Sequence, residues 1–109
     1  MNNNHLAQRD LDHVWHPCTQ MKDHEAIPPI PIRRGEGIWL EDHNGQRYLD
    51  AISSWWVNLF GHCNPQITGA IKAQLDELEQ VIMAGVTHQP AGELAEKLCA
   101  ITPGNLNRV

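Results

Sequence analysis

Seven prolines divide this sequence into short segments and set where helices and strands can begin and end. Each proline lacks a backbone N–H and has a fixed φ, so it interrupts regular structure. Residues 6–15 have a helical pattern of apolar side chains, but Pro17 restricts His16 to extended geometry and must end that helix. Residues 26–32 contain three prolines and should form an extended linker that lies along other structure.

Two amphipathic helices are expected in the second half of the chain. Asn64 can cap the first, and Pro65 suits its first position because a proline there loses no hydrogen bond. The apolar stripe of this helix comprises Ile67, Ile71, Leu75, Leu78 and Ile82. Pro90 starts the second helix, and Pro103–Gly104 ends it. Its apolar face comprises Ala91, Leu94, Ala95, Leu98 and Ile101.

A β-hairpin is the clearest strand signal. Residues 37–41 and 46–50 are short strand-like runs, and Asn44–Gly45 between them favours a tight turn because both residue types tolerate positive φ. Trp39 lies in the first run, where packing in a core is its simplest role. Residues 106–109 alternate apolar and polar side chains like the start of a further strand.

Composition excludes several classes of protein. The 109 residues carry 8 Lys and Arg against 13 Asp and Glu, a net charge of −5, and this acidic balance argues against nucleic-acid binding. No apolar run approaches the roughly 18 residues of a membrane span, and the N-terminus lacks the features of a signal peptide. Three cysteines without a Cys-x-x-Cys pair suggest reduced thiols. We therefore expect a cytoplasmic α+β chain with one hairpin and two amphipathic helices.

Tryptophan is unusually frequent among the aromatic residues, with four Trp against one Tyr and one Phe. Trp55 and Trp56 are adjacent, and neighbours in an extended segment point to opposite faces, so both cannot enter one small core.

Two further clusters contain reactive side chains. The zinc-ligand types His13, His16, Cys18 and His24 gather near one another in the sequence, but Pro17 prevents a helix that would align them, and a metal module stays a weak alternative. Cys63 precedes a predicted helix, where the helix dipole could activate a thiol, although a plain turn residue is the simpler interpretation.

Four segments, in this order, resemble one enzyme family. They are WHPCTQM at residues 15–21, LDAISSWW at 49–56, GHCNP at 61–65 and GVTHQP at 85–90. Together they are similar to the N-terminal part of the diaminononanoate synthases, the adenosylmethionine-8-amino-7-oxononanoate aminotransferases of biotin biosynthesis. The hairpin and the Asn-Pro helix alone would indicate only the wider class III aminotransferases.

The resemblance implies a pyridoxal-phosphate enzyme with the α/β type I aminotransferase fold, which is a homodimer with sites at the subunit interface. Its cofactor would act as an electron sink in a ping-pong transfer of an amino group from S-adenosylmethionine to 8-amino-7-oxononanoate. Residues 1–60 would belong to the small domain, and residues 61–109 would lead into the large cofactor-binding domain.

By the same resemblance, three residues would contact substrate. Trp55 matches a tryptophan that lines the substrate pocket, and Trp56 matches its neighbour. Flat indoles can cover the methylenes of a long acceptor at about 0.8 kcal/mol for each CH₂. Cys18 stands where relatives have a tyrosine that helps recognise both substrates. A thiol lacks the phenol's reach and strong donor, so that contact is either lost or made by another side chain or a water.

The catalytic and cofactor-binding groups of the family, including the Schiff-base lysine, correspond to positions beyond Val109. The resemblance therefore predicts no catalytic, cofactor-binding or metal-binding residue in this chain, which covers roughly the first quarter of the enzyme and should be inactive alone. The alternative is a free-standing, non-enzymatic binding module or a decayed gene fragment.

Overall fold

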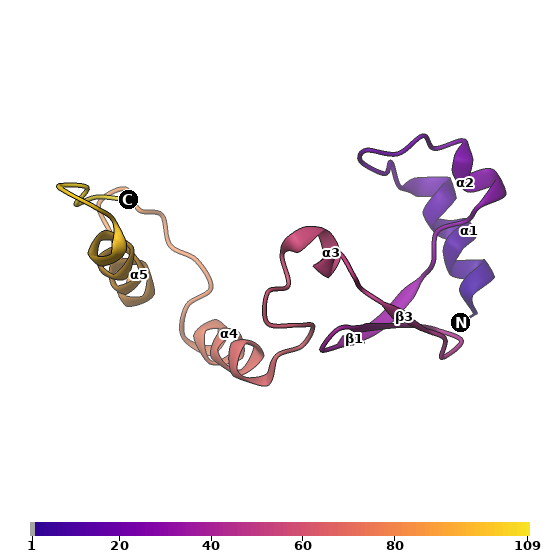
Figure 1. Ribbon diagram of the computed structural model, residues 1–109. Coiled ribbons are helices and arrows are strands. Elements are labelled where there is room, and N and C mark those ends of the chain that lie inside the picture. The colour runs from indigo at the N-terminus through magenta and orange to yellow at the C-terminus, as the bar shows by residue number, and fades with distance from the viewer. Residues whose placement is uncertain (1) are drawn as a thin grey trace. The chain divides into compact units, whose positions relative to one another are not determined.

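The computed structural model describes residues 2–109 and shows a small α+β chain, as predicted (Figure 1). It forms two compact units, Met1–Thr68 and Gly69–Val109. The elements, in chain order, are α1 (Asn3–His13), α2 (Asp23–Ala26), β1 (Ile32–Glu36), β2 (Trp39–Asp42), β3 (Arg47–Leu49), α3 (Ser53–Trp56), α4 (Pro65–Glu77) and α5 (Gln89–Ile101). None of the helices within residues 2–109 has both the length and the apolar character that crossing a bilayer requires.

Helix α1 confirms the helix predicted before Pro17. It begins three residues earlier than the apolar pattern because the side chain of Asn2 caps it, accepting a hydrogen bond from the His5 N–H at 3.0 Å. The helix ends at His13, and Val14 is already extended. The side-chain amide of Asn3 donates to Asp42 at 2.8 Å, so the start of α1 is tied to the sheet.

The sheet has three antiparallel strands in the order β1-β2-β3. Strands β2 and β3 confirm the predicted hairpin, with Leu40 opposite Tyr48. Strand β1 was not predicted from the sequence. The proline-rich linker ends at Pro31, and pairing with β2 begins at Ile32. The side chains of β1 are mostly exposed, and its sequence Ile-Arg-Arg-Gly-Glu has no alternation of apolar and polar residues. Its strand conformation therefore depends on the hydrogen-bonded ladder with β2.

Asp42 organises the turn of the hairpin. Its Oδ1 accepts the backbone N–H groups of Asn44 and Gln46, both at 2.9 Å, and its Oδ2 accepts the Tyr48 hydroxyl at 3.0 Å. The side chain is almost fully buried. Burial raises the pKa of Asp42, but its hydrogen bonds, first that from Asn3, outweigh burial and hold the pKa below its ordinary value.

Helix α4 confirms the predicted start and corrects the predicted end. The Asn64 side chain accepts hydrogen bonds from the N–H groups of Gln66 and Ile67 at 3.0 and 3.3 Å. The helix stops at Glu77, so the prediction that Leu78 and Ile82 belong to it is wrong. Asp76 and Glu77 place negative charge where the terminal carbonyls already carry partial negative charge, which disfavours extension.

Helix α5 matches its prediction at both ends. The imidazole of His88 caps it by accepting the Ala91 N–H at 3.3 Å, and Pro90 lies in the first turn. The helix ends at Ile101, before Pro103–Gly104. The strand predicted at residues 106–109 is wrong, because this segment has no strand structure and nothing in the described part of the chain forms a ladder with it.

The chain buries very little apolar surface of its own. Within residues 2–109, only Ala7 and Asp42 are buried. The predicted core position of Trp39 is wrong for this chain, because Trp39 lies on the sheet with the Arg47 guanidinium 4.8 Å from its ring centroid and remains partly exposed. The apolar stripes of α4 and α5 are also uncovered, with Leu75 59% and Ile101 79% exposed.

Candidate functional site

The two adjacent tryptophans lie in a left-handed turn. This turn is the element labelled α3, residues 53–56, and we call it the Trp turn. Its successive φ values are 49°, 47°, 73° and 64°. The expectation that Trp55 and Trp56 occupy an extended segment is therefore wrong. A left-handed conformation costs a non-glycine residue roughly 1–2 kcal/mol, and such strain persists only where surrounding contacts enforce it. The two rings meet edge to face, with centroids 6.3 Å apart and planes at 74°, and both are exposed.

Asp50 holds the Trp turn from one side. One carboxylate oxygen accepts the Ser54 N–H at 2.9 Å, and the other accepts the Ser54 hydroxyl and His62 Nε2, each at 2.7 Å. Only 6% of the Asp50 side chain is exposed. The hydrogen bonds from the Ser54 N–H and hydroxyl are the main reason that the pKa of Asp50 is lowered, so this carboxylate is ionised at neutral pH.

His62 connects Asp50 to the sheet. Its backbone forms a bridge with Gly37 through hydrogen bonds of 2.8 and 3.1 Å. The Asn58 amide lies 3.3 Å from His62 Nδ1, and Nε2 faces Asp50. A neutral imidazole with its proton on Nε2 satisfies both contacts. Because both ring nitrogens are engaged, neither is free to activate the adjacent Cys63, which is exposed.

Cys18 lies in the loop between α1 and α2, away from regular structure. It too has a left-handed φ, 52°, and its side chain is exposed. Within residues 2–109, the hydrogen bonds and ring contacts do not join Cys18 to the Trp turn. The structure thus brings Trp55 and Trp56 together but gives Cys18 no contact with them.

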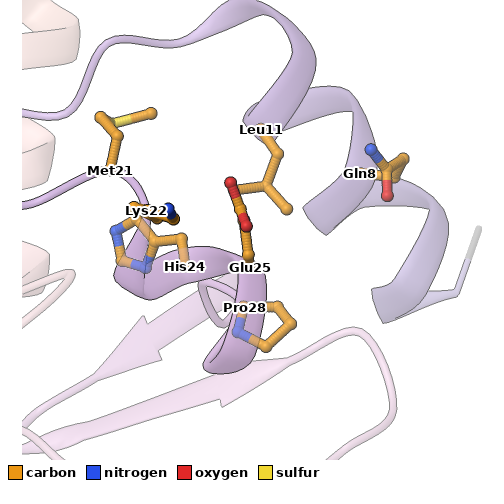
Figure 2. Close-up of a pocket in the computed structure, with 7 residues that line it drawn as sticks. All are labelled: Gln8, Leu11, Met21, Lys22, His24, Glu25 and Pro28. Atoms are coloured by element: carbon orange, nitrogen blue, oxygen red, sulfur yellow. The ribbon is translucent and has the colours of Figure 1, made fainter.

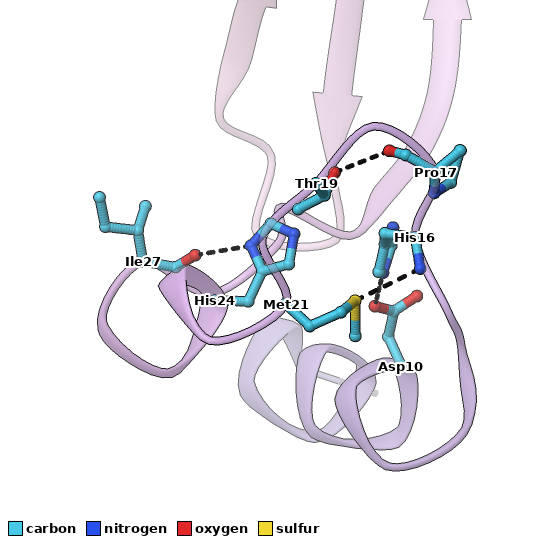
Figure 3. A network of polar contacts seen from close by, with 7 residues as sticks. All are labelled: Asp10, His16, Pro17, Thr19, Met21, His24 and Ile27. Carbon is cyan, nitrogen blue, oxygen red and sulfur yellow. Dashed lines mark hydrogen bonds and ion pairs between the residues drawn. The ribbon is translucent and has the colours of Figure 1, made fainter.

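The histidines near Cys18 are held by other polar groups (Figure 3). His16 Nε2 pairs with the Asp10 carboxylate, and its ring meets that of His24 edge to face, with centroids 5.1 Å apart. His24 Nδ1–H donates to the Ile27 carbonyl at 3.1 Å. In the part of the chain that the structure describes, no three His, Cys, Asp or Glu side chains converge in the way a metal ion requires.

Several hollows lie in the first unit, and two of them differ in size and lining. The hollow in Figure 2 has a volume of about 690 Å³. Its lining mixes charged, polar and apolar side chains, namely Gln8, Leu11, Met21, Lys22, His24, Glu25 and Pro28. A smaller hollow of about 280 Å³ follows the Trp turn in sequence, and its walls include Val57, Phe60 and Ile67. The second is predominantly apolar, so it suits an aliphatic group better.

Comparison with known proteins decides the family. The class-III aminotransferase family pattern matches residues 19–109. This chain belongs to the class III aminotransferases. It is 50% identical over 97 residues to the adenosylmethionine-8-amino-7-oxononanoate aminotransferase of Helicobacter pylori, a match that covers 89% of this chain and 22% of the relative.

Solved structures of aminotransferases share the fold of this segment. The adenosylmethionine-8-amino-7-oxononanoate aminotransferase of Methanocaldococcus jannaschii superposes with a TM-score of 0.92 at 43% identity, over 98% of this chain and 24% of that one. An (S)-enantioselective omega-transaminase from Thermomicrobium roseum gives 0.90 at 31% identity, over 99% and 24%. The segment therefore has the fold of type I aminotransferases, and it spans less than a quarter of the length of these relatives.

Class III aminotransferases are pyridoxal-phosphate enzymes, but the residues of this chain do not fit that cofactor. A lysine that forms an imine at neutral pH needs an apolar or otherwise perturbed environment to lose its proton. All three lysines, Lys22, Lys72 and Lys97, are exposed.

The sequence did not identify Asp50 and His62 as functional residues. Asp50 belongs to the Asp-x-x-Ser-Ser-Trp-Trp segment that carries the family resemblance, and its spacing to Ser54 allows a side-chain cap. That spacing is the one local signal for its role. His62 is 12 positions from Asp50, so only the folded chain reveals their contact.

Proposed function

We propose that this chain is the N-terminal segment of an enzyme that transfers an amino group from S-adenosylmethionine to 8-amino-7-oxononanoate, giving 7,8-diaminononanoate for biotin biosynthesis. The proposal is supported by relatives of that name at 43–50% identity, aligned over most of this chain. The enzyme would use pyridoxal phosphate bound by residues outside this segment. The segment alone is expected to be inactive.

The observation that carries the proposal is the Trp turn. Six non-glycine residues in the described part of the chain have positive φ, and they include Trp55, Trp56 and Cys18. Left-handed backbone at large aromatic residues is costly, and such strain concentrates at functional sites. Trp55 and Trp56 leave 55% and 77% of their surfaces exposed, which is a poor arrangement for packing within this segment and a suitable one for contact with a ligand.

The acceptor gives the exposed indoles a physical role. Its aliphatic chain offers several methylenes, and each one buried against an indole contributes about 0.8 kcal/mol. The apolar hollow lined by Val57 and Phe60 follows the Trp turn in sequence and would offer a second apolar surface for that chain. Trp55 is therefore proposed as the main apolar contact, and Trp56 as its edge-to-face support.

Cys18 is proposed as a third substrate-binding position. It is exposed on a left-handed loop, so it can face a ligand without displacing other side chains. The thiol is a weak donor in comparison with a phenol. Recognition at this position is expected to be weaker than in relatives that have tyrosine there.

Assembly of the full enzyme would cover the apolar surface that this segment leaves exposed. We propose a cytoplasmic homodimer in which residues 1–60 belong to the small domain and residues 61–109 lead into the large domain. The uncovered stripes of α4 and α5 support this proposal, because a free-standing module would have to leave them in water. The same observation weighs against a non-enzymatic binding module.

The test is a two-stage transfer assay on the complete protein that contains this segment. The protein is incubated with S-adenosylmethionine, freed from it, and then given the oxononanoate acceptor. A ping-pong aminotransferase forms one equivalent of diamine per active site in the second stage. Lys72→Ala serves as a control and should retain activity because Lys72 is exposed on α4. No diamine with either protein would refute the proposal, as would a reading frame without a downstream Schiff-base lysine.

A further inference from the structure

We infer that Asp50 and His62 are a positioning pair that fixes the Trp turn and thereby sets the enzyme's selectivity for a long-chain oxo acid as acceptor. The inference rests on the proposed function, since it assigns the acceptor contact to Trp55 and Trp56. Neither Asp50 nor His62 touches the substrate. They act through the conformation of the turn.

The Trp turn is strained and needs support from outside itself. Four consecutive non-glycine residues are left-handed, and the backbone hydrogen bonds around them, such as Trp56 N–H to Ile52 at 2.7 Å, would be equally available to a right-handed turn. Something beyond local backbone bonding must select the left-handed form. The Ser54 N–H and hydroxyl both bind Asp50, at 2.9 and 2.7 Å, and Ser54 is the second residue of the turn.

Asp50 is itself anchored to the sheet. It follows strand β3 directly, and its own N–H donates to the Ile38 carbonyl at 2.9 Å. Its side chain is nearly buried and receives three hydrogen bonds on two oxygens. An amide offers one accepting oxygen and presents N–H groups at the other position, so Asn at this position could not receive all three donors.

His62 fits closely against the sheet. A Cβ atom on Gly35 would lie 2.7 Å from the His62 Cβ, and one on Gly61 would lie 2.9 Å from the Gly37 Cα. These glycines allow the backbone of His62 to bridge Gly37. The sheet thus holds His62, His62 holds Asp50, and Asp50 holds the turn that displays the two indoles.

Asp42 provides a matched control because it performs the same chemistry elsewhere. It is a buried carboxylate at a turn and accepts backbone N–H groups from Asn44 and Gln46 along with side-chain donors. Its turn carries no tryptophan. Loss of Asp42 should therefore destabilise the fold without altering the Trp turn.

The experiment compares Asp50→Ala, Asp50→Asn, Ser54→Ala and Asp42→Ala in the complete enzyme. One readout is the exciton coupling of the two indoles in circular dichroism, with Trp55→Phe and Trp56→Phe defining its loss. The second is KM for each substrate.

We expect Asp50→Ala to abolish the coupling and to raise KM for the oxononanoate acceptor about tenfold, as loss of hydrogen bonds to a charged group does. The milder Ser54→Ala should fold normally and shift both readouts in the same direction. His62→Ala should behave like Asp50→Ala, and Asp50→Asn should lie between that variant and wild type.

The two readouts distinguish failure of the positioning role from failure of the proposed function. Retention of full coupling in Asp50→Ala and Ser54→Ala would overturn the positioning role. An equal loss of coupling in Asp42→Ala would also overturn it, since general destabilisation would then explain the effect. Loss of coupling with unchanged KM for both substrates would support positioning and refute the acceptor contact that the proposed function assigns to the indoles.

Discussion

Substitution of Gly61 by alanine should destabilise the first unit through two separate effects. Gly61 has φ +80°, and a Cβ there would lie 2.9 Å from the Cα and 3.0 Å from the carbonyl oxygen of Gly37. The left-handed conformation costs alanine roughly 1–2 kcal/mol. The collision is with backbone, which cannot rotate away, and overpacking of this kind costs roughly 1–3 kcal/mol more. The expected loss is therefore about 2–5 kcal/mol in free energy of unfolding.

Gly45→Ala separates the two effects. Gly45 has a similar φ of +85° in the hairpin turn, but no atom lies within 4 Å of the Cβ position, so only the conformational cost of about 1–2 kcal/mol applies. Thermal unfolding of the complete enzyme should rank wild type above Gly45→Ala and Gly45→Ala above Gly61→Ala. We compare midpoints because a large enzyme with a cofactor does not unfold in two states. Equal midpoints for the two variants would refute the close approach of Gly61 to Gly37.

Two further predictions concern single side chains. The pKa of Asp42 is lowered in the folded state, so its stabilising effect is present above its unfolded pKa of about 4 and is lost as the pH falls through the folded value. Asp42→Asn should lower the melting temperature at pH 7 and narrow the gap to wild type as the pH falls towards about 3, and a gap independent of pH would contradict this. Cys18→Tyr should lower KM for both substrates if Cys18 faces the site, whereas unchanged kinetics would show that position 18 is not a recognition site in this enzyme.

The elements that the sequence predicted well are those with local signals. Helix α4 starts at Asn64 and Pro65, and helix α5 starts at His88 and Pro90. Asn44–Gly45 forms the hairpin turn. Each of these signals is local, because a helix cap, the fixed φ of proline and the positive φ that Asn and Gly tolerate all act within a few residues. The prediction failed where the partner is distant in the sequence. Strand β1 follows no apolar period and forms because β2 is beside it.

The Trp turn shows the same limit at the candidate site. The adjacent indoles could be recognised as unusual from the sequence, and the surrounding motif indicated the family. Their left-handed turn is hydrogen-bonded to Asp50, which in turn contacts His62 twelve residues away. No pattern within the motif specifies that contact. Sequence reasoning thus proposed the two indoles as ligand contacts and missed the side chains that are hydrogen-bonded to their turn.

The role of Trp55 as an acceptor contact is best tested by measuring KM for the oxononanoate acceptor in Trp55→Ala and in Trp39→Ala. Trp39 is also a partly exposed tryptophan, but it lies on the sheet under Arg47 and has no proposed contact with substrate. We expect Trp55→Ala to raise this KM at least tenfold while its melting temperature stays close to wild type, since loss of about two buried methylenes has that effect. Trp39→Ala should leave the KM unchanged. An unchanged KM for Trp55→Ala together with a large fall in melting temperature would contradict the proposed contact and make Trp55 a packing residue.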